Sequence, residues 1–446
     1  MKQAETINQF ARNMNPIAPL DAADRQAYVP IYDHILADLR DRVLYEDQVT
    51  QTFFIAGQSG TGKTTALNFL VDDELNEHFA VRFIRGKDLF DPSDIDIIDL
   101  LLMLAFCLVR GSSLEEHYYK SLNRIQKIHD GVLSEETLSE HHSLNKIGGS
   151  GEASAAIGFF DFVKLKSRFF ANYQQDQHRR VKTREAFKLR KNELLDMVND
   201  LIDRVRGEEV GNKPLLMVID DLDKLRNIKQ IRSVFLENRY FLTNIQCTKI
   251  IAIPIHLTNE PEITNLDPNV PNFGLALKPN PLYNKSGSQD LHARRQLLRN
   301  VVLQRIQEGC ALIENDALDE AITFSGGLIR QFMLIVHTAA RQARRNKQET
   351  VIKENVAYAC QQLANNLERW AVTSARIQCL ETIRRHHIPQ AGSSDEWTEA
   401  LLGNHIIAFT NGSFWYSVNP LIEKTIEIYA GRVQQNESEA FCQALC

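Results

Sequence analysis

The first part of the chain alternates between short apolar runs and longer stretches that have apolar residues at helical spacing. Tyr28 to Leu44 has helical spacing and leads into the apolar run Thr52 to Ala56, which predicts a helix followed by a buried strand. Phe79 to Ile84 predicts a second strand, and Asp94 to Val109 predicts a strongly apolar helix. Strands that alternate with helices in this way indicate a parallel sheet with helices on its faces.

The pattern changes at Gly111 into long, charged and mostly helical segments, which we interpret as an insertion that ends near Arg206. Pro214 to Ile219 and Lys249 to Ile255 then predict two further strands of the same sheet. The stretch Asn259 to Ser288 is rich in Pro and Asn, a composition typical of a linker.

The pattern beyond the linker predicts helices, followed by a hairpin. Four consecutive helical segments form a small all-α unit: Leu291 to Gln307, Glu314 to Phe324, Ile329 to Asn346 and Lys353 to Asn366. From Arg376 onward, helices precede two short strands, His405 to Thr410 and Ser413 to Val418. These strands are joined by Asn411-Gly412, a dipeptide typical of tight hairpin turns.

A complete phosphate-binding motif, G-x-x-x-x-G-K-[ST], follows the first predicted strand and precedes a helical stretch. Its glycines allow backbone N–H groups to point inward at a phosphate, and the following helix adds the positive end of its dipole. Lys63 would reach the β and γ oxygens, and Thr64 would give its hydroxyl to Mg²⁺. We predict that the nucleotide is bound by Gly57, Gln58, Ser59, Gly60, Thr61, Gly62, Lys63, Thr64 and Thr65.

A second motif, Leu215 to Asp223, is an apolar strand that ends in a cluster of carboxylates. An acid at the tip of such a strand can hold a metal ion, and its neighbour can orient or deprotonate the attacking water. We therefore assign Asp220 to Mg²⁺ and Asp221 to the general base. The alternative is that the cluster only caps a helix, and for Asp223 capping is the better account.

The sequence favours ATP over GTP. A guanine-binding Asn-Lys-x-Asp motif is absent downstream of the phosphate loop, since Asn284 to Gly287 lacks the acid. ATP with Mg²⁺ is therefore the predicted cofactor pair.

These motifs resemble those of the AAA+ and STAND branches of P-loop ATPases, especially the replication-initiator-like members built from a core, a helical lid and a winged helix. Gly57 to Thr64 matches the Walker A motif. Ile219 to Asp223 matches the STAND form of Walker B, with Asp-Asp where AAA+ members usually carry Asp-Glu. The resemblance implies hydrolysis of ATP to ADP and phosphate.

The resemblance also implies two sensor residues. Ser325 to Arg330 is similar to the sensor 2 motif, in which the arginine, here Arg330, touches the γ-phosphate. The alternative for this arginine is a solvated position on its helix. Sensor 1 is a polar residue at the end of the strand after Walker B, and we choose His256, with Thr258 and Asn259 as alternatives. The catalytic residues predicted in this way are Lys63, Asp221, His256 and Arg330.

The architecture implied is an α/β P-loop NTPase core, a parallel sheet flanked by helices, with further units behind it. Residues 1–262 would form the core, with a helical and basic insertion at about 111–206. Residues 263–370 would form the linker and an all-α lid, and residues 371–446 a winged-helix domain. The helix expected to read DNA, Ser394 to Leu402, carries three acids and no Lys or Arg. We therefore expect this domain to contact protein or to shut the ATPase.

Charge and composition limit the partners of this 446-residue chain. Its formal net charge of −6 gives no general attraction to nucleic acid or anionic lipid. Lys164 to Lys191, however, carries ten basic residues against two acids, so it could bind a phosphate backbone or form a solvated face against an acidic neighbour. No apolar run is long enough to span a membrane, and Met1 to Asn15 does not resemble a signal peptide. Seven cysteines without Cys-x-x-Cys favour a cytoplasmic location.

The resemblance implies an ATP-driven switch that forms a homo-oligomer depending on the bound nucleotide. Its setting would be a bacterial anti-phage defence or signalling complex, with the effector on a separate chain. Two alternatives stay open. The first is a DNA-binding initiator or loader that uses residues 164–191, and the second is a nucleotide-binding scaffold without turnover.

Overall fold

The computed structural model describes residues 1–17, 19–45, 50–71, 73–86, 94–108, 177–208, 213–275, 277, 287–371, 373–388, 395–409 and 414–431. Two features of the sequence lie outside these residues. They are the predicted insertion up to residue 176, which includes the part of the basic segment over 164–176, and the predicted hairpin turn Asn411-Gly412.

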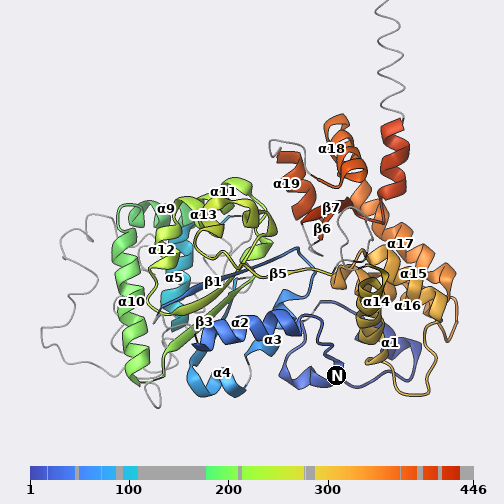
Figure 1. Cartoon of the computed structure of the whole chain (residues 1–446), viewed down its shortest axis with the longest axis horizontal. Coiled ribbons are helices and arrows are strands. Elements are labelled where there is room, and N and C mark those ends of the chain that lie inside the picture. The colour runs from blue at the N-terminus through green and yellow to red at the C-terminus, as the bar shows by residue number, and fades with distance from the viewer. Residues whose placement is uncertain are drawn as a thin grey trace, which may run out of the picture.

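The core of the described chain is a five-stranded parallel sheet with the strand order β2-β3-β4-β1-β5 (Figure 1). The four predicted strands are confirmed. The fifth, β5, is a two-residue strand inside the predicted linker, where Asn272 and Phe273 pair with Ala56 and Gly57. The strands are β1 (Thr52–Gly57), β2 (Ala80–Arg85), β3 (Leu215–Asp220), β4 (Thr248–Ile253) and β5 (Asn272–Phe273).

The strand order places the two nucleotide motifs at one edge of the sheet. Strand β4 pairs with β1 on one side and with β3 on the other, and all three run parallel. Their carboxyl ends therefore meet at the same edge, with Gly57 at the end of β1 and Asp220 at the end of β3. Every residue of β3 and β4 is buried, as expected for strands covered by helices on both faces.

Helices cover both faces of the sheet (Figure 1). Alternate side chains of β1 and β3 enter two different apolar clusters, with Phe53 and Val218 in one and Phe54 and Ile219 in the other. The first cluster contains α2 (Asp33–Tyr45) and α3 (Lys63–Leu70), and α4 (Asp73–His78) follows on the same side. The second contains α5 (Ile97–Leu108), α9 (Gln177–Phe187) and α10 (Lys191–Glu208). Between β3 and β4 lie α11 (Ile228–Arg232), η4 (Ser233–Glu237) and α12 (Arg239–Thr243), and β4 is followed by η5 (Ile255–Asn259) and α13 (Pro261–Thr264).

The predicted all-α unit is confirmed, and we call it the helical unit. It consists of α14 (Gly287–Leu303), α15 (Asn315–Ser325), α16 (Ile329–Arg345) and α17 (Lys353–Glu368). The N-terminal helix α1 (Ile7–Asn13) packs on α16 rather than on the sheet, and His337 Nδ1 lies 2.7 Å from the Ala11 carbonyl oxygen. The beginning of the chain thus belongs spatially to this unit, together with η1 (Ala22–Ala27) nearby (Figure 1).

The C-terminal unit, as we call residues 373–431, contains α18 (Ser374–His386), α19 (Asp395–Leu402) and a final helix over 423–431. Strands β6 (Ile406–Phe409) and β7 (Trp415–Val418) pair antiparallel, as the predicted hairpin requires. Helices and a small two-stranded sheet are elements of a winged helix. The classification of this unit as a winged helix stays a prediction. Across the described residues, every helix is either too short or too polar to span a bilayer.

Candidate functional site

The phosphate-binding loop lies between the end of β1 and the start of α3 at Lys63. Gly60 and Gly62 have φ angles of +93° and +95°, a left-handed conformation that side chains disfavour. The helical unit also packs directly against both positions. A Cβ on Gly60 would lie 3.0 Å from the Arg330 Cβ, and one on Gly62 would lie 2.9 Å from the Ile329 Cδ1. Glycine is therefore required here for the curl of the loop and for its contact with α16.

Lys63 is almost completely buried, with 4% of its surface exposed. Its Nζ donates hydrogen bonds to the carbonyl oxygens of Gly57 at 2.6 Å and Gln58 at 3.0 Å. It also forms a 2.8 Å ion pair with Oδ2 of Asp223. The capping role expected for Asp223 is therefore wrong. Its carboxylate is held by the lysine of the phosphate loop because this buried ammonium needs a counter-charge.

Asp220 lies at the tip of β3 with no exposed surface. Among the described residues, neither of its carboxylate oxygens has a well-formed hydrogen bond. Burial raises the pKa of Asp220, as do the charges of Asp223 and Asp221, whereas the nearby Thr64 hydroxyl acts to lower it. Two predicted metal ligands, the Thr64 hydroxyl and the Asp220 carboxylate, are thus brought together.

This pair fits Mg²⁺ in particular. The described residues contain no group of three His, Cys, Asp or Glu side chains that could hold an ion alone. Mg²⁺ takes one or two protein oxygens and completes its shell with water and substrate phosphates. A buried carboxylate with free oxygens beside a hydroxyl meets that requirement when a nucleotide supplies the remaining ligands.

Asp221, the predicted general base, is buried and has a left-handed backbone with φ of 73°. Its carboxylate forms an ion pair with Lys224 Nζ. Lys224 and Asp223 both line the cavity beside the phosphate loop, and Asp221 does not appear among the described lining residues. Asp221 and Asp223 are therefore both candidates for the general base, the role that the sequence predicts for Asp221.

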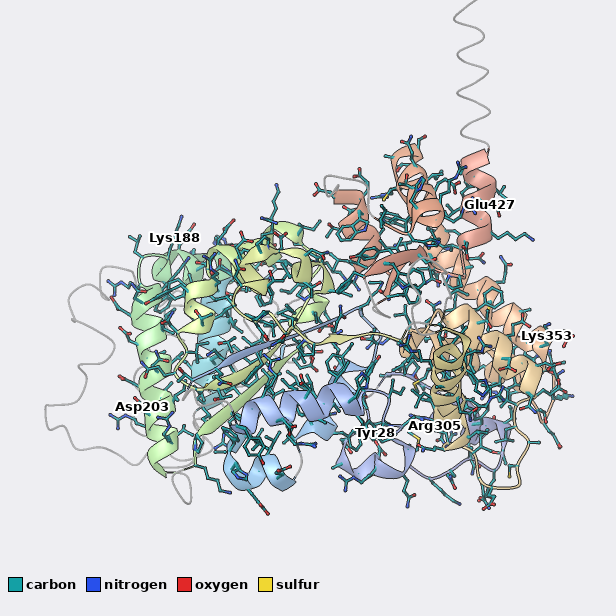
Figure 2. All side chains as sticks on the ribbon, in the orientation of Figure 1. Tyr28, Lys188, Asp203, Arg305, Lys353 and Glu427 are labelled. Atoms are coloured by element: carbon teal, nitrogen blue, oxygen red, sulfur yellow. The ribbon has the colours of Figure 1, made fainter. Side chains whose placement is uncertain are left out.

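A cavity of about 220 Å³ opens beside the loop and is formed by three separate parts of the chain. The N-terminal segment contributes apolar and aromatic side chains, the core contributes the phosphate loop, and the helical unit contributes α14 and α16. Tyr28 and Arg305, both labelled in Figure 2, belong to this lining. The lining includes residues of the N-terminal segment, the phosphate loop, the acidic strand end and α16, among them Tyr28, Val29, Tyr32, Gly60, Lys63, Thr64, Thr65, Asp223, Lys224, Ile329 and Arg330.

Aromatic side chains of the N-terminal segment are fixed against the core. The Tyr32 hydroxyl donates a 2.7 Å hydrogen bond to the Thr61 carbonyl of the loop. The Tyr28 ring stacks on Phe69 of α3, with 3.9 Å between ring centroids. Burial raises the pKa of Tyr28 to about 12, so its hydroxyl stays neutral. The sequence assigned Tyr28 and Tyr32 to a helix, which in the structure begins only at Asp33. It did not indicate their place beside the phosphate loop, because this segment precedes both motifs and has no motif of its own.

Arg330, the predicted sensor 2 residue, lies at the start of α16 and beside the phosphate loop. Its backbone N–H donates a 2.9 Å hydrogen bond to the Gly60 carbonyl, and its side chain lines the cavity. The preceding glycines are needed because other units approach them closely. A Cβ on Gly326 would clash with Ile407 of the C-terminal unit, and one on Gly327 would clash with the Leu275 carbonyl.

The C-terminal unit also contacts the phosphate loop directly. The Gln58 side chain is 2% exposed, and its Nε2 donates hydrogen bonds to the carbonyl oxygens of Leu401 at 3.1 Å and Ile406 at 2.6 Å. Its Oε1 accepts a hydrogen bond from the Ala408 N–H at 3.1 Å. Asn404 Nδ2 donates to the Ser59 carbonyl at 3.2 Å. These contacts could not be predicted from the sequence, because Gln58 occupies a variable position of the motif.

The predicted sensor 1 residues lie away from the described lining of the cavity. His256 is buried on η5, and neither ring nitrogen has a hydrogen-bond partner within the described part of the chain. Burial lowers its pKa to about 4, with a further contribution from the Arg232 charge. Thr258 donates to the Ile255 carbonyl, and Asn259 contacts the Tyr416 hydroxyl of the C-terminal unit.

Two arginines of the basic segment point inward. Arg184 forms 2.6 Å ion pairs with both Asp94 and Asp99, and Arg180 forms a 3.0 Å ion pair with Asp94. Arg180 is 4% exposed. For these two residues, the expectation of an accessible phosphate-binding or solvated face is therefore wrong, because both are used to join α9 to the N-terminal end of α5.

Comparison with known proteins gives one family. A model described as the KAP family P-loop domain matches residues 32–255, half of the chain. That stretch contains the phosphate loop and the acidic strand end. Among curated proteins, none matches the sequence.

Several solved structures are similar over most of the chain. The Drosophila ORC bound to DNA is 12% identical, covering 96% of this chain and 92% of its own, with a TM-score of 0.39. The Aeropyrum pernix ORC1 protein in complex with DNA is 11% identical, covering 94% and 98%, with a TM-score of 0.41. A Walker-type ATPase of Pyrococcus abyssi is 12% identical, covering 93% and 99%, with a TM-score of 0.44. Likeness at this level carries no functional conclusion.

Proposed function

The chain belongs to the KAP family of P-loop NTPases, and on that basis we propose that it binds Mg·ATP between the core and the helical unit and hydrolyses it to ADP and phosphate. The observation that carries this proposal is the arrangement around the phosphate loop. Lys63 and Thr64 meet the carboxylates of Asp223 and Asp220, and Arg330 closes the cavity from α16. Cations, a metal-binding pair and a second structural unit thus converge where a triphosphate would lie.

The lining of the cavity contains groups that suit both parts of ATP. Apolar and aromatic side chains of the N-terminal segment, such as Tyr28 and Val29, would surround the base. Lys63, Lys224 and Arg330 would supply positive charge for the phosphates. ATP is proposed rather than GTP because the sequence lacks the acid of the guanine-binding motif.

Thr64 and Asp220 would hold Mg²⁺, which supplies positive charge to the phosphates when it is bound. Lys63 has to exchange its ion pair with Asp223 for phosphate oxygens, while its bonds to the loop carbonyls keep it in place.

Asp221 is proposed as the general base, which orients the attacking water and takes its proton. Asp223 is the second candidate, because it lines the cavity. Arg330 is proposed to contact the γ-phosphate, and His256 retains the sensor 1 role only as a sequence prediction.

We further propose that nucleotide binding drives a conformational switch with an oligomeric state as its output. The cavity that supports this proposal is lined by residues of both the core and the helical unit. Bound ATP would therefore make different contacts in two arrangements of these units and would favour one of them. A separate effector chain would read that state. The defence setting rests on the resemblance alone and forms no part of this proposal.

The test is ATP binding and phosphate release by purified protein and its Lys63→Ala variant, with Mg²⁺ present. Loss of the ammonium should abolish measurable binding of a slowly hydrolysed ATP analogue in calorimetry. Lys353→Ala, which removes a largely exposed lysine on α17, is the matched control and should bind like the wild type. Equal affinity in the Lys63→Ala variant would remove the assignment of the phosphate loop, and binding without phosphate release would reduce the protein to a scaffold.

A further inference from the structure

Helix α19 of the C-terminal unit ends against the nucleotide motifs. It has acids in its first turn and no basic residue in its last turn, so it does not supply a cation to its own C-terminal end. The carbonyls of Glu399 and Ala400 are capped locally by the N–H groups of Gly403 and His405. The carbonyl of Leu402 instead accepts a hydrogen bond from Nη1 of Arg226. This helix end is therefore capped by a residue of the core.

The core residues that donate to the last carbonyls of α19 lie in the phosphate loop and just after the acidic strand end. Gln58, in the phosphate loop, donates to the Leu401 carbonyl, and Arg226, which follows the acidic end of β3, donates to the next carbonyl along. The Leu402 side chain is buried in the same apolar cluster as Leu222 and Leu225, beside the acidic residues. The end of α19 thus lies beside the phosphate loop, while neither α19 nor Arg226 belongs to the described lining of the cavity.

The charges near Arg226 are those of the proposed phosphate site. The charge of Asp223, which pairs with Lys63, favours the protonated guanidinium, and the charge of Arg330 opposes it. Arg226 is an exposed residue, and the part of its guanidinium that is desolvated against α19 lowers its pKa. Arg226 therefore lies near Asp223 of its own unit and near Arg330 of the helical unit. A γ-phosphate bound to Lys63 would bring additional negative charge to the same place.

We propose that Arg226 contacts the terminal phosphate of ATP in exchange for the Leu402 carbonyl, so that the end of α19 loosens only while that phosphate is bound. A guanidinium bonds a phosphate more strongly than a neutral carbonyl, and ADP lacks the phosphate in question. The inference rests on the proposed function. By linkage, if bound ATP weakens the docking of α19 on the core, then docking of α19 weakens the binding of ATP by the same factor.

The experiment compares the wild type with Arg226→Ala and Arg226→Lys, with Lys229→Ala as the matched control. Lys229 is an exposed cation three residues along the chain. Affinities for a slowly hydrolysed ATP analogue and for ADP are measured with Mg²⁺. Arg226→Ala should lose about tenfold in affinity for the analogue, as expected for one charged hydrogen bond, and should bind ADP within about twofold of the wild type. Arg226→Lys keeps the charge and should retain most of the preference for the triphosphate.

A second readout follows α19 itself through amide hydrogen exchange of Gly403 and His405, whose N–H groups cap its last turn. In the wild type, these amides should exchange faster with the ATP analogue than with ADP. In Arg226→Ala, exchange should be equally fast with both nucleotides, whereas Lys229→Ala should behave as the wild type does.

Either of two results would overturn the inference. One is an unchanged ratio of the two affinities in Arg226→Ala, and the other is wild-type exchange that does not differ between the two nucleotides. Failure of the wild type to bind either nucleotide would instead overturn the proposed function. If Arg226→Ala does not fold, Arg226→Lys replaces it. This variant keeps the charge that the phosphate needs, so the two amides should still exchange faster with the ATP analogue than with ADP, and equal exchange with both nucleotides would overturn the inference.

Discussion

The side-chain amide of Gln58 donates a 2.6 Å hydrogen bond to the carbonyl oxygen of Ile406, so a residue of the phosphate loop is bonded to strand β6 of the C-terminal unit. The same amide accepts a bond from the Ala408 N–H two residues along that strand. Gln58 thus occupies one edge of β6 much as a neighbouring strand would. Because its own backbone belongs to the phosphate loop, the C-terminal unit and the nucleotide site are mechanically connected.

Gln58→Glu should detach the C-terminal unit from the core. The variant keeps the size of the side chain, removes both donated hydrogen bonds and places a carboxylate against the carbonyls of Leu401 and Ile406. Two lost buried hydrogen bonds plus a poorly solvated charge should cost about 3 kcal/mol of docking free energy. Denaturant unfolding and limited proteolysis of the segment between the helical and C-terminal units would measure the loss. Gln361→Glu, an exposed change on α17, is the control, and equal behaviour of the two variants would contradict the role of Gln58.

The parts of the site that could be predicted are those encoded by local pattern. Strand β1 and the loop after it combine a continuous apolar run with glycines at fixed spacing, and the structure places them as expected. Strand β5 could not be found, because two residues paired with Ala56 and Gly57 leave no periodic signal inside a Pro-rich stretch. The same limit applies to Gln58, whose three hydrogen bonds reach residues more than 300 positions away.

Charged residues were predicted least well, because their partners decide where they point. Asp223 has the sequence context of a helix cap, but the buried ammonium of Lys63 competes for its carboxylate. Arg184 belongs to a strongly basic run, yet Asp94 and Asp99 from the preceding part of the core hold it inside. Neither partner is visible in the local sequence. A charge pattern predicts exposure only where no buried counter-charge exists in the fold.

Asp221→Asn should slow the hydrolysis of ATP, whereas Asp223→Asn should strengthen the binding of ATP. If Asp221 is the base, its amide variant should bind ATP and hydrolyse it at least about tenfold more slowly, which corresponds to about 1.4 kcal/mol in the barrier. Asp223→Asn should raise affinity for ATP a few-fold, since it removes the carboxylate that competes with phosphate for Lys63. Steady-state phosphate release and equilibrium binding separate the two effects. A large loss of turnover in Asp223→Asn alone would move the base to that residue.

Arg330→Ala should separate nucleotide binding from assembly. The backbone bond from residue 330 to the Gly60 carbonyl does not need the side chain, so the helical unit should stay on the phosphate loop and ATP should still bind. The guanidinium proposed to contact the γ-phosphate would be lost. Mass photometry with and without ATP should then show a distribution of oligomers that no longer responds to the nucleotide. Arg341→Ala, on the exposed side of α16, should respond as the wild type does, and a normal response in Arg330→Ala would exclude the sensor role.

His256 should make the folded state sensitive to acid. Burial lowers its pKa to about 4, below the value near 6.5 of an exposed histidine, so the unfolded chain binds the proton first as the pH falls. The stability that comes from the neutral buried ring is therefore fully present above about pH 6.5 and is lost progressively toward about pH 4. Between about pH 7.5 and about pH 5.5, this one group should remove about 1.4 kcal/mol from the free energy of unfolding.

Urea unfolding of the wild type and of His256→Gln at these two pH values measures that contribution. The variant should lose less stability on acidification than the wild type, by about the amount given by the single histidine. His292→Gln, an exposed change on α14, should leave the pH dependence as it is in the wild type. His405, whose pKa burial also lowers to about 4, should make both proteins less stable in acid, so only the difference between them reports on His256. The same loss of stability in the wild type and in His256→Gln would show that the His256 ring does not stay neutral inside the fold.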